Sequence, residues 1–343
     1  MKKNTKIIIP MAGKGSRLHP HTFNTPKPFI SIAGKIILSR LLESLSKVIK
    51  IFSIQEIVFI IGNFEKKIEK QLIKLSNDVG VNPIIYYQKT PLGTADALLK
   101  AKDSLIGGPI IIAFSDTLFY GNIEKEITDK VDNIIWTKKI KNPHLFGVVK
   151  CDSSGIITHF VEKPNNYVSN LAIIGLYYLK NSLFFKEELQ SILLDNNNNE
   201  QEYQLTYVLE NMRKKGEKFT SKQVKKWMDF GNKKRTIYSN SKILSMESKH
   251  SELINKKAII KNSLIINPCS IEENTIIENS IIGPYVSIGK HAKIKNSNIK
   301  RSLIQDHSKI FNANFNNSMI GNHTFYIKKE KEVSLGDFSI FKN

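Results

Sequence analysis

The sequence of 343 residues is poor in cysteine and contains no long apolar run. Cys151 and Cys269 are its only cysteines and lie far apart, so the sequence predicts neither a disulfide framework nor a cysteine-bound metal. The longest apolar stretches, such as residues 171–179, are much shorter than the roughly 18 residues needed to cross a bilayer. The apolar stretch after Lys2 and Lys3 is too short for a signal peptide. These absences predict no membrane partner and favour a reducing, cytoplasmic compartment.

Acidic residues are also scarce, because 31 Asp and Glu stand against 51 Lys and Arg, for a formal charge of +20. Such a charge raises the hypothesis of a nucleic-acid or anionic-surface partner. The basic residues are scattered, however, as at 138–141, 225–226 and 233–235, and aromatic residues do not interleave with them in one patch. We therefore expect no nucleic-acid partner. An affinity for small anionic substrates is compatible with the charge.

The most informative segment covers residues 10–17, where Gly13 and Gly15 precede Arg17. Lys27 follows in a Pro-Lys-Pro run. Glycines let a backbone approach an anion closely, and the two cations supply the charge that a polyphosphate requires. The segment is not a Walker A loop, because no Gly-Lys-Ser/Thr triplet closes it, and not a dinucleotide fingerprint, because leucine occupies the third glycine position. An ordinary glycine turn between a strand and a helix is the alternative interpretation.

Apolar segments of strand length alternate with helical patterns in the first part of the chain. Helices are expected near residues 37–49, 68–75, 94–101 and 233–247, and strands near 7–9, 57–61, 84–87, 110–114, 134–136, 146–150, 156–161 and 172–179. This alternation predicts a mostly parallel sheet covered by helices, with ligands beyond the carboxyl ends of its strands. The glycine loop, Gln88 and Asp116 each follow a strand, so we expect one crevice to collect them. A polar tract at residues 195–199 predicts a loop.

The periodicity changes after residue 247, where isoleucine recurs every five or six residues with Asn, Gly, Ser and Glu between. The recurring positions are Ile259, Ile265, Ile271, Ile277, Ile282, Ile288, Ile294, Ile299, Ile304 and Ile310. Hexapeptide spacing predicts a left-handed parallel β-helix, in which each coil buries its isoleucines on its neighbours. The predicted fold class is therefore α/β. A Rossmann-like domain with a mixed, mostly parallel sheet covers residues 1–247, and a left-handed parallel β-helix covers residues 248–343.

Residues 13–28 resemble the signature of the sugar-1-phosphate nucleotidylyltransferases, the nucleoside-diphosphate-sugar pyrophosphorylases. That signature is G-x-G-x-R followed after about ten residues by a P-K-P-like segment, and both halves are present here. Further segments resemble the same family, in the same order, up to about residue 240. They are Gln88-Lys89-Thr90-Pro91-Leu92-Gly93-Thr94-Ala95, Ser115-Asp116, Gly147-Val148-Val149, Glu162-Lys163-Pro164, Gly175-Leu176-Tyr177, Glu202-Tyr203-Gln204-Leu205-Thr206 and Trp227-Met228-Asp229-Phe230-Gly231.

The resemblance implies a role for individual positions. For catalysis it implies Arg17 and Lys27. For nucleotide binding it implies Ala12, Gly13, Gly15, Gln88, Gly93 and Thr94. For sugar-phosphate binding it implies Gly147, Glu162, Lys163 and Gly175. For metal binding it implies that Asp116 and Asp229, distant in the sequence, face one Mg²⁺.

Some positions depart from the family pattern, and structural interpretations stay open for others. Ile173 and Ile174 replace a frequent Asn-Ala before the last glycine, and Tyr207 replaces the Asp of E-x-x-L-T-D. In a purely structural interpretation, Thr94 caps its own helix and Trp227 is a core residue.

The activity implied by the resemblance is transfer of a nucleotidyl group from a nucleoside triphosphate, dTTP or UTP, to glucose 1-phosphate. The alternatives are a mannose-1-phosphate guanylyltransferase and a non-catalytic regulatory or scaffold relative. Some β-helix domains are acyltransferases, which raises His291, His307 and His323 as bases. We expect instead a structural or oligomerising β-helix, so a homo-oligomer stays open.

Overall fold

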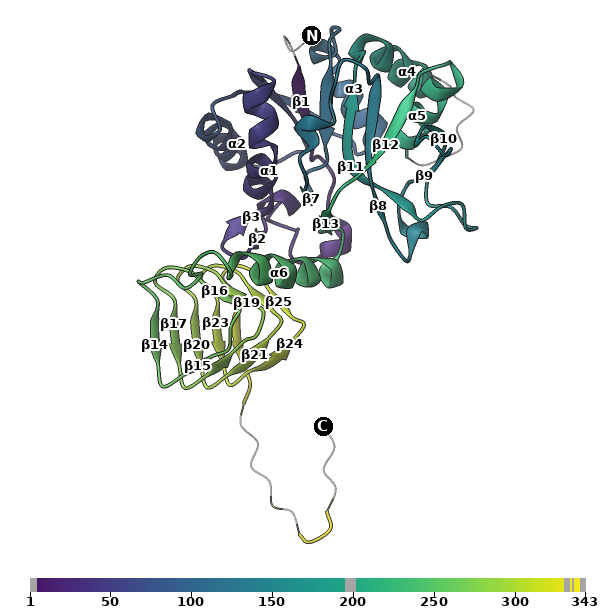
Figure 1. Cartoon of the computed structure of the whole chain (residues 1–343). Helices are drawn as coiled ribbons and strands as arrows, with labels where there is room; N and C mark the ends of the chain where they lie inside the picture. Colours follow the sequence, from purple (N-terminus) through teal and green to yellow (C-terminus); the bar gives the residue numbers. More distant parts are fainter. Residues whose placement is uncertain (1–4, 195–201, 330–333, 335, 340–343) are drawn as a thin grey trace. The chain divides into compact units, whose positions relative to one another are not determined.

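The structure is a computed structural model (Figure 1) that describes residues 5–194, 202–329, 334 and 336–339. Its contacts divide the chain into two compact units. The first unit contains Met1–Ile30 and Lys35–Arg235, and the second contains Ser31–Gly34 and Thr236–Asn343. The loop expected at residues 195–199 lies outside the described residues. Among the helices that are described, none combines the length and the apolar character needed to cross a membrane.

The first unit is built on a mixed sheet (Figure 1). Its strands are β1 (Lys6–Pro10), β4 (Glu56–Ile61), β5 (Asn82–Tyr87), β6 (Ile110–Ala113), β8 (Asn133–Lys139), β9 (Val148–Cys151), β10 (Ile157–Val161), β11 (Leu171–Leu179) and β12 (Phe219–Gln223). β5, β4, β1 and β6 are parallel neighbours, and β11 continues the sheet antiparallel to β6. A smaller sheet pairs β7 (Thr117–Tyr120) with β13 (Lys226–Asp229) in antiparallel register. The carboxyl ends of the parallel strands therefore meet at one edge.

Helices cover the sheet because each has a buried apolar side. They are α1 (Ile37–Ile51), α2 (Lys66–Asp78), α3 (Thr94–Lys100), α4 (Ser182–Leu194) and α5 (Leu205–Lys214). A further helix, α6 (Lys233–Glu247), belongs from Thr236 onward to the second unit. The short elements are the 3-10 helices η1 (Ser16–Leu18), η2 (Lys27–Phe29), η3 (Lys102–Ser104), η4 (Ile123–Lys125) and η5 (Pro143–Leu145), and the strands β2 (Ser31–Ile32) and β3 (Lys35–Ile36). In α1, Leu38, Leu41, Leu45 and Val48 recur every three or four residues and are fully buried. α3, α4 and α5 share one hydrophobic core with β1, β4 and β6.

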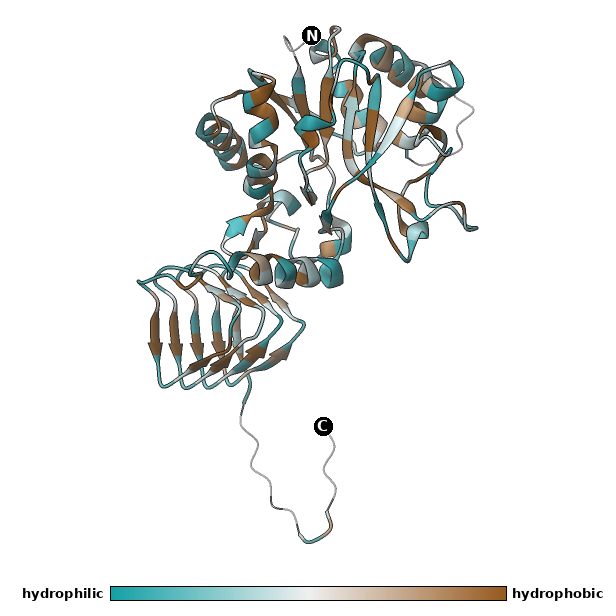
Figure 2. Cartoon of the chain, viewed as in Figure 1, coloured by the Kyte–Doolittle hydropathy of each residue, from teal (hydrophilic) through white to brown (hydrophobic). Residues whose placement is uncertain are grey.

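The strands of the parallel part read as continuous apolar runs because helices cover both faces of the sheet. Every residue of β6 is buried, as is every residue of β4 after Glu56. Figure 2 shows these strands in brown, the colour of hydrophobic residues, whereas the helices of the first unit alternate between brown and teal. The predicted mixed, mostly parallel α/β domain is confirmed.

Most of the second unit consists of coils of parallel strands, and the predicted left-handed β-helix is confirmed (Figure 1). One face stacks β14 (Ile259–Lys261), β17 (Ile276–Glu278), β20 (Lys293–Lys295), β23 (Lys309–Phe311) and β26 (Phe325–Ile327). The second face stacks β15 (Leu264–Ile265), β18 (Ile281–Ile282), β21 (Asn298–Lys300) and β24 (Asn314–Asn316). The third face stacks β16 (Cys269–Ile271), β19 (Val286–Ile288), β22 (Leu303–Ile304) and β25 (Met319–Ile320).

The recurring isoleucines from Ile271 to Ile310 form the core of the coils. The prediction is wrong for Ile259, which is 46% exposed. β14 pairs with β17 so that Ile260, and not Ile259, aligns with the buried Ile277. Because successive residues of a strand point to opposite faces, the inward position of the first coil is shifted by one residue.

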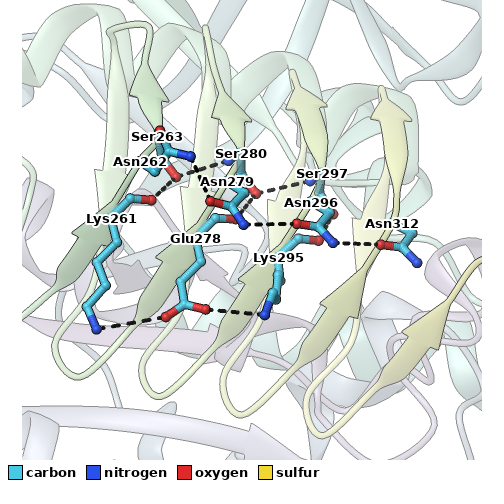
Figure 3. Close-up of polar contacts among 10 residues, drawn as sticks. All are labelled: Lys261, Asn262, Ser263, Glu278, Asn279, Ser280, Lys295, Asn296, Ser297 and Asn312. Atoms are coloured by element: carbon cyan, nitrogen blue, oxygen red, sulfur yellow. Dashed lines mark hydrogen bonds and ion pairs between the residues drawn. The ribbon is translucent and has the colours of Figure 1, made fainter.

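Asparagines occupy one corner of the coils in the left-handed backbone region. Asn262, Asn279, Asn296 and Asn312 have φ values of 44°, 50°, 51° and 54°. Their side-chain amides form a ladder with N–O distances of 2.8, 3.3 and 3.2 Å, visible in Figure 3. Asparagine suits this corner because it tolerates positive φ better than most residues and also bonds the next coil.

Histidines occupy another corner in the same way. His291, His307 and His323 are exposed and have φ values of 56°, 59° and 55°. Their rings stack with centroids 4.8 Å apart at both steps. Coil geometry therefore accounts for the spacing of these histidines in the sequence.

Candidate functional site

The glycine loop follows β1 directly, and Met11 N–H donates a hydrogen bond to the Ile60 carbonyl at 2.8 Å. Gly15 has a φ of 63° and precedes η1, a conformation that favours glycine. Thr22 Oγ1 donates to the Gly15 carbonyl at 2.8 Å and fixes the turn. A Cβ atom at Gly13 would meet no protein atom within 4 Å. The space beside Gly13 is therefore open to a ligand.

One pocket of about 590 Å³ lies beyond the carboxyl ends of β1, β5 and β6. It is lined by every residue that the sequence assigned to a site: Ala12, Gly13, Gly15, Arg17, Lys27, Gln88, Gly93, Thr94, Asp116, Gly147, Glu162, Lys163, Gly175 and Asp229. The prediction that the glycine loop, Gln88 and Asp116 share a crevice is confirmed. The chemical role of each residue remains a prediction.

Two carboxylates from distant parts of the sequence lie together in this pocket. Asp116 immediately precedes β7, and Asp229 ends β13. The register of these strands places Thr117 opposite Asp229, and Phe230 N–H donates to the Asp116 carbonyl at 3.1 Å. Strand pairing therefore brings the two aspartates to one place.

Each of the two carboxylates has a cationic neighbour. Lys27 Nζ lies 2.8 Å from Asp116 Oδ2, and Arg235 Nη1 lies 2.7 Å from Asp229 Oδ2. Gly231 N–H also donates to Asp229 Oδ1 at 3.0 Å. The pocket thus contains two acid–base pairs side by side rather than an isolated acidic cluster.

The two aspartates differ in their electrostatics. Burial raises the pKa of Asp116, but the charge and hydrogen bond of Lys27, together with the charge of Arg17, lower it below its ordinary value. Burial and the negative charge of Asp116 raise the pKa of Asp229, and Arg235 offsets only part of this rise. A further cation between the carboxylates would relieve the repulsion that Asp229 experiences.

Asp116 and Asp229 are the residues of this pocket that could hold a metal ion. Within the described residues, no cluster of three or more His, Cys, Asp or Glu side chains is arranged to hold a metal. Mg²⁺ nevertheless commonly uses one or two carboxylates and completes its shell with water and substrate phosphates. The two carboxylates line one pocket and repel each other, which favours a cation there.

Glu162, which follows β10, also lines the pocket. Thr206 Oγ1 donates to Glu162 Oε2 at 2.6 Å, and Lys163 Nζ lies 3.6 Å from Glu162 Oε1. A Cβ atom at Gly147 would lie 3.0 Å from Glu162 Oε2. Gly175, with a φ of 82° where the register of β11 shifts, would place a Cβ atom 2.9 Å from a neighbouring side chain. Both glycines allow the backbone to approach closely here.

The orientation of the buried Gln88 side chain is determined by its neighbours. Gln88 Nε2 donates to Asp96 Oδ2 at 2.7 Å and to the Gly93 carbonyl at 3.1 Å. Asp96 also pairs with Lys100 at 2.8 Å. A carboxylate only accepts hydrogen bonds, so the amide nitrogen must face Asp96 and the amide oxygen points elsewhere. Gly93 is required because its φ is 110° and a Cβ atom would lie 2.5 Å from the Tyr203 backbone.

The structural interpretations of Thr94 and Trp227 are wrong. Thr94 is the first residue of α3 and does not cap it; its Oγ1 accepts a hydrogen bond from Leu205 N–H at 2.8 Å, at the start of α5. Trp227 is half-buried and lines the pocket, and its Nε1 donates to Thr117 Oγ1 at 2.7 Å. The fully buried tryptophan is Trp136.

Sequence reasoning missed Arg235, Thr206 and Asp96, which hold predicted site residues in place. A basic residue soon after the W-x-D-x-G motif was the available signal for Arg235. Thr206 belongs to the E-x-x-L-T segment, so its polar contact could have been expected. Tyr207, at the position where the family has Asp, packs against the hydrophobic core.

The fold and the pocket define a class: an α/β domain whose ligand site lies beyond the carboxyl ends of parallel strands, followed in sequence by a parallel β-helix. Residues 6–246 match the family described as Nucleotidyl transferase. Residues 233–313 match the family described as GlmU-like, C-terminal hexapeptide. The chain belongs to the nucleotidyl transferase family.

Similar curated proteins come from archaea and animals. The chain is 30% identical over 261 residues to the bifunctional protein GlmU of Methanococcus aeolicus, covering 76% of this chain and 59% of that protein. It is 28% identical to the mannose-1-phosphate guanylyltransferase catalytic subunit beta of Drosophila melanogaster, covering 67% of this chain and 60% of that protein. It thus spans about three fifths of the length of these two relatives. It is 26% identical to the low-salt glycan biosynthesis nucleotidyltransferase Agl11 of Haloferax volcanii, with 87% of both chains covered.

Solved structures support the fold. A Bacillus anthracis protein described as a glucose-1-phosphate thymidylyltransferase matches with a TM-score of 0.60 and 21% identity, over 69% of this chain and 94% of that one. A UDP-glucose pyrophosphorylase complexed with UDP-glucose matches with a TM-score of 0.60 and 19% identity, over 71% and 99% of the two chains.

Proposed function

We propose that the protein transfers a nucleotidyl group from a nucleoside triphosphate to a sugar 1-phosphate and releases pyrophosphate. The observation that carries this proposal is the single pocket that joins the glycine loop, the two cation–carboxylate pairs and the Glu162–Lys163 wall. A phosphate oxygen of the sugar 1-phosphate attacks the α-phosphorus, a new P–O bond forms, and the bond to the bridging oxygen of the β-phosphate breaks. Pyrophosphate leaves with the electron pair of that bond. No covalent intermediate with the protein is required.

Bringing two polyanions together is the main electrostatic problem of this reaction. The open space at Gly13 would receive the triphosphate, with Arg17 and Lys27 as its positive partners. Preorganised positive groups that face developing charge are usually the largest contribution to catalysis. When bound between Asp116 and Asp229, Mg²⁺ would supply further neutralisation of the triphosphate charge.

The part of the pocket lined by Glu162 and Lys163 would bind the sugar phosphate. Glu162, oriented by its hydrogen bond from Thr206, would accept hydrogen bonds from sugar hydroxyls. Lys163, which is 56% exposed along its side chain, would pair with the sugar's phosphate. At Gly147 a Cβ atom would crowd Glu162 and Thr206, so glycine at this position keeps the Glu162 carboxylate in place.

Gln88 would contact the base through its amide oxygen, because its amide nitrogen is engaged by Asp96 and Gly93. Uracil and thymine present a ring N3–H group that such an oxygen can accept. This contact would suit dTTP or UTP. We propose glucose 1-phosphate as the sugar substrate because the two matching solved structures are a glucose-1-phosphate thymidylyltransferase and a UDP-glucose pyrophosphorylase.

A second candidate is guanylyl transfer to mannose 1-phosphate. The guanylyltransferase of Drosophila melanogaster is among the similar proteins, and guanine also carries a ring N–H that the Gln88 oxygen could accept. A non-catalytic relative is disfavoured because Arg17, Lys27, Asp116 and Asp229 all line one pocket.

The test is to incubate the purified full-length protein with Mg²⁺, each nucleoside triphosphate and either glucose 1-phosphate or mannose 1-phosphate. Pyrophosphate release and nucleotide-sugar formation are both measured. We expect turnover with dTTP or UTP and glucose 1-phosphate. Turnover confined to GTP and mannose 1-phosphate would select the second candidate, and no nucleotide-sugar in any mixture would overturn the proposal.

A further inference from the structure

The chain crosses from one unit to the other after Ile30, after Gly34 and after Arg235. Two of these crossing points lie close in sequence to the cationic residues of the pocket. Lys27 lies shortly before the first crossing, and Arg235 is the last residue of the first unit. Residues Ser31–Gly34, named here the inserted segment, belong by their contacts to the second unit although they follow the P-K-P run.

Gln305 holds the inserted segment at its first residue. Ser31 N–H donates to Gln305 Oε1 at 3.2 Å, and Gln305 Nε2 donates to the Ser31 carbonyl at 3.0 Å. One buried amide therefore satisfies both backbone groups of Ser31, as a neighbouring strand would. The two backbone partners also fix which way the amide points.

Asn240, on α6 and fully buried, holds the inserted segment at its turn. Ala33 N–H donates to Asn240 Oδ1 at 3.1 Å, and Ser287 Oγ donates to the same oxygen at 2.7 Å. Ala33 and Gly34 have φ values of 46° and 80°, so the turn adopts a left-handed conformation that needs support.

The Asn240 amide oxygen accepts two hydrogen bonds, but the amide nitrogen is buried and finds no hydrogen-bond partner among the described residues. A buried polar group without a partner lowers stability.

The β-helix does not need a glutamine at residue 305. Strand registers align Ile271, Ile288, Ile304 and Ile320, so the residues that follow them form one column along the coils. That column contains Glu272, Gly289, Gln305 and Gly321. Because the other coils are built with different residues at this position, the Gln305 amide is specific to its contact with Ser31.

We propose that Gln305 and Asn240 are positioning residues for the reaction proposed above, because they fix the inserted segment and thereby the Lys27 side chain against Asp116. Residues 28–30, which connect Lys27 to Ser31, are buried and transmit a displacement of Ser31 to the η2 turn. The expected effect on catalysis rests on the proposed function, whereas the expected effect on the placement of Lys27 does not.

The first test measures the placement of Lys27 without any turnover. The ligand-free full-length protein is treated with limiting acetic anhydride, and acetylation of Lys27 is followed by peptide mass spectrometry. In the wild type this ammonium is paired with Asp116 and its side chain is only 14% exposed, so labelling is slow. We expect Gln305→Ala to raise the Lys27 labelling rate severalfold.

The matched control is Ser297→Ala. Ser297 is also a buried β-helix residue whose side chain makes two hydrogen bonds: its Oγ donates to the Lys295 carbonyl at 2.8 Å and accepts from Ala313 N–H at 3.0 Å. Within the described residues, none of the hydrogen bonds of Ser297 reaches the inserted segment. We expect Ser297→Ala to leave Lys27 labelling and turnover at wild-type levels.

The second test separates kcat from KM in the same variants. A small misplacement of a catalytic group can cost about 100-fold in rate, so we expect Gln305→Ala to lower kcat about 10- to 100-fold with little change in KM. Gln305→Glu has nearly the same size, keeps the acceptor for Ser31 N–H and loses the donor to the Ser31 carbonyl. Gln305→Glu should lower kcat by less than Gln305→Ala does. It is the variant that tests the positioning role if Gln305→Ala does not fold.

The outcomes separate the two proposals. Unchanged Lys27 labelling and unchanged kcat in a folded Gln305 variant would overturn the positioning role. Equal effects of the Gln305 variants and Ser297→Ala would overturn it as well, because general destabilisation would explain both. If the wild type forms no nucleotide-sugar, the proposed function fails, while the labelling experiment still decides whether Gln305 positions Lys27.

Discussion

The ion pair between Lys27 and Asp116 allows a direct test of the proposed chemistry. Lys27→Met keeps most of the side-chain volume but removes the ammonium that lies 2.8 Å from Asp116 Oδ2. Unit charges about 4 Å apart interact by about 4 kcal/mol at an effective dielectric constant near 20. Removing one preorganised donor that stabilises a transition state typically lowers kcat by about 10²–10³. We therefore expect the kcat of Lys27→Met to fall about 100- to 1000-fold.

Lys35→Met is the matched control for this experiment. Lys35 Nζ also lies 2.8 Å from a carboxylate, Glu43 Oε1, but the two side chains are 52% and 50% exposed. Such an exposed pair contributes about 0–1 kcal/mol, so the control should keep wild-type kcat. Initial rates of pyrophosphate release at saturating substrate are compared, with melting curves to establish folding. A folded Lys27→Met protein that retains more than about a tenth of the wild-type kcat would refute the reasoning.

Three further predictions concern the framework. Gly93→Ala should lower the melting temperature and weaken triphosphate binding, because its φ is 110° and a Cβ atom would lie 2.5 Å from the Tyr203 backbone; calorimetry and nucleotide titration check this. Burial raises the pKa of Glu210, but Arg213 lowers it below the ordinary value of 4.5. The ionised Glu210 side chain therefore stabilises the fold at pH values above its unfolded-state pKa, and this stabilisation disappears as the pH falls through its folded-state pKa. Glu210→Gln should therefore destabilise the protein at about pH 7 and much less at about pH 3, and a pH-independent difference in melting temperature would contradict this. Asn279→Ala should cost about 1–2 kcal/mol more than Asn279→Gly in urea unfolding, because the φ of 50° strains alanine but not glycine.

The fold could be predicted from the sequence because both units repeat a local pattern. Buried parallel strands are continuous apolar runs, so the expected strand at residues 57–61 corresponds to β4 (Glu56–Ile61). The isoleucine repeat likewise predicted the coils. It failed at Ile259, since two adjacent isoleucines leave the inward residue undecided until the pairing with β17 is known.

The candidate site was predicted where a residue type answers a local backbone requirement. Gly15 and Gly93 adopt conformations that disfavour side chains, and such positions are visible in a motif. Arg235 and Thr206 were missed because their roles depend on contacts through space with Asp229 and Glu162.

The sequence by itself determined the order of elements, the two kinds of periodicity and the identity of the pocket-lining motifs, because these depend on neighbours along the chain. Only the tertiary structure decided that β7 and β13 bring Asp116 and Asp229 together, and that each carboxylate receives its own cation. It also decided that Ser31–Gly34 belongs with the β-helix. Such contacts join residues that are far apart in sequence, and their partners are chosen by packing and strand register rather than by any local preference.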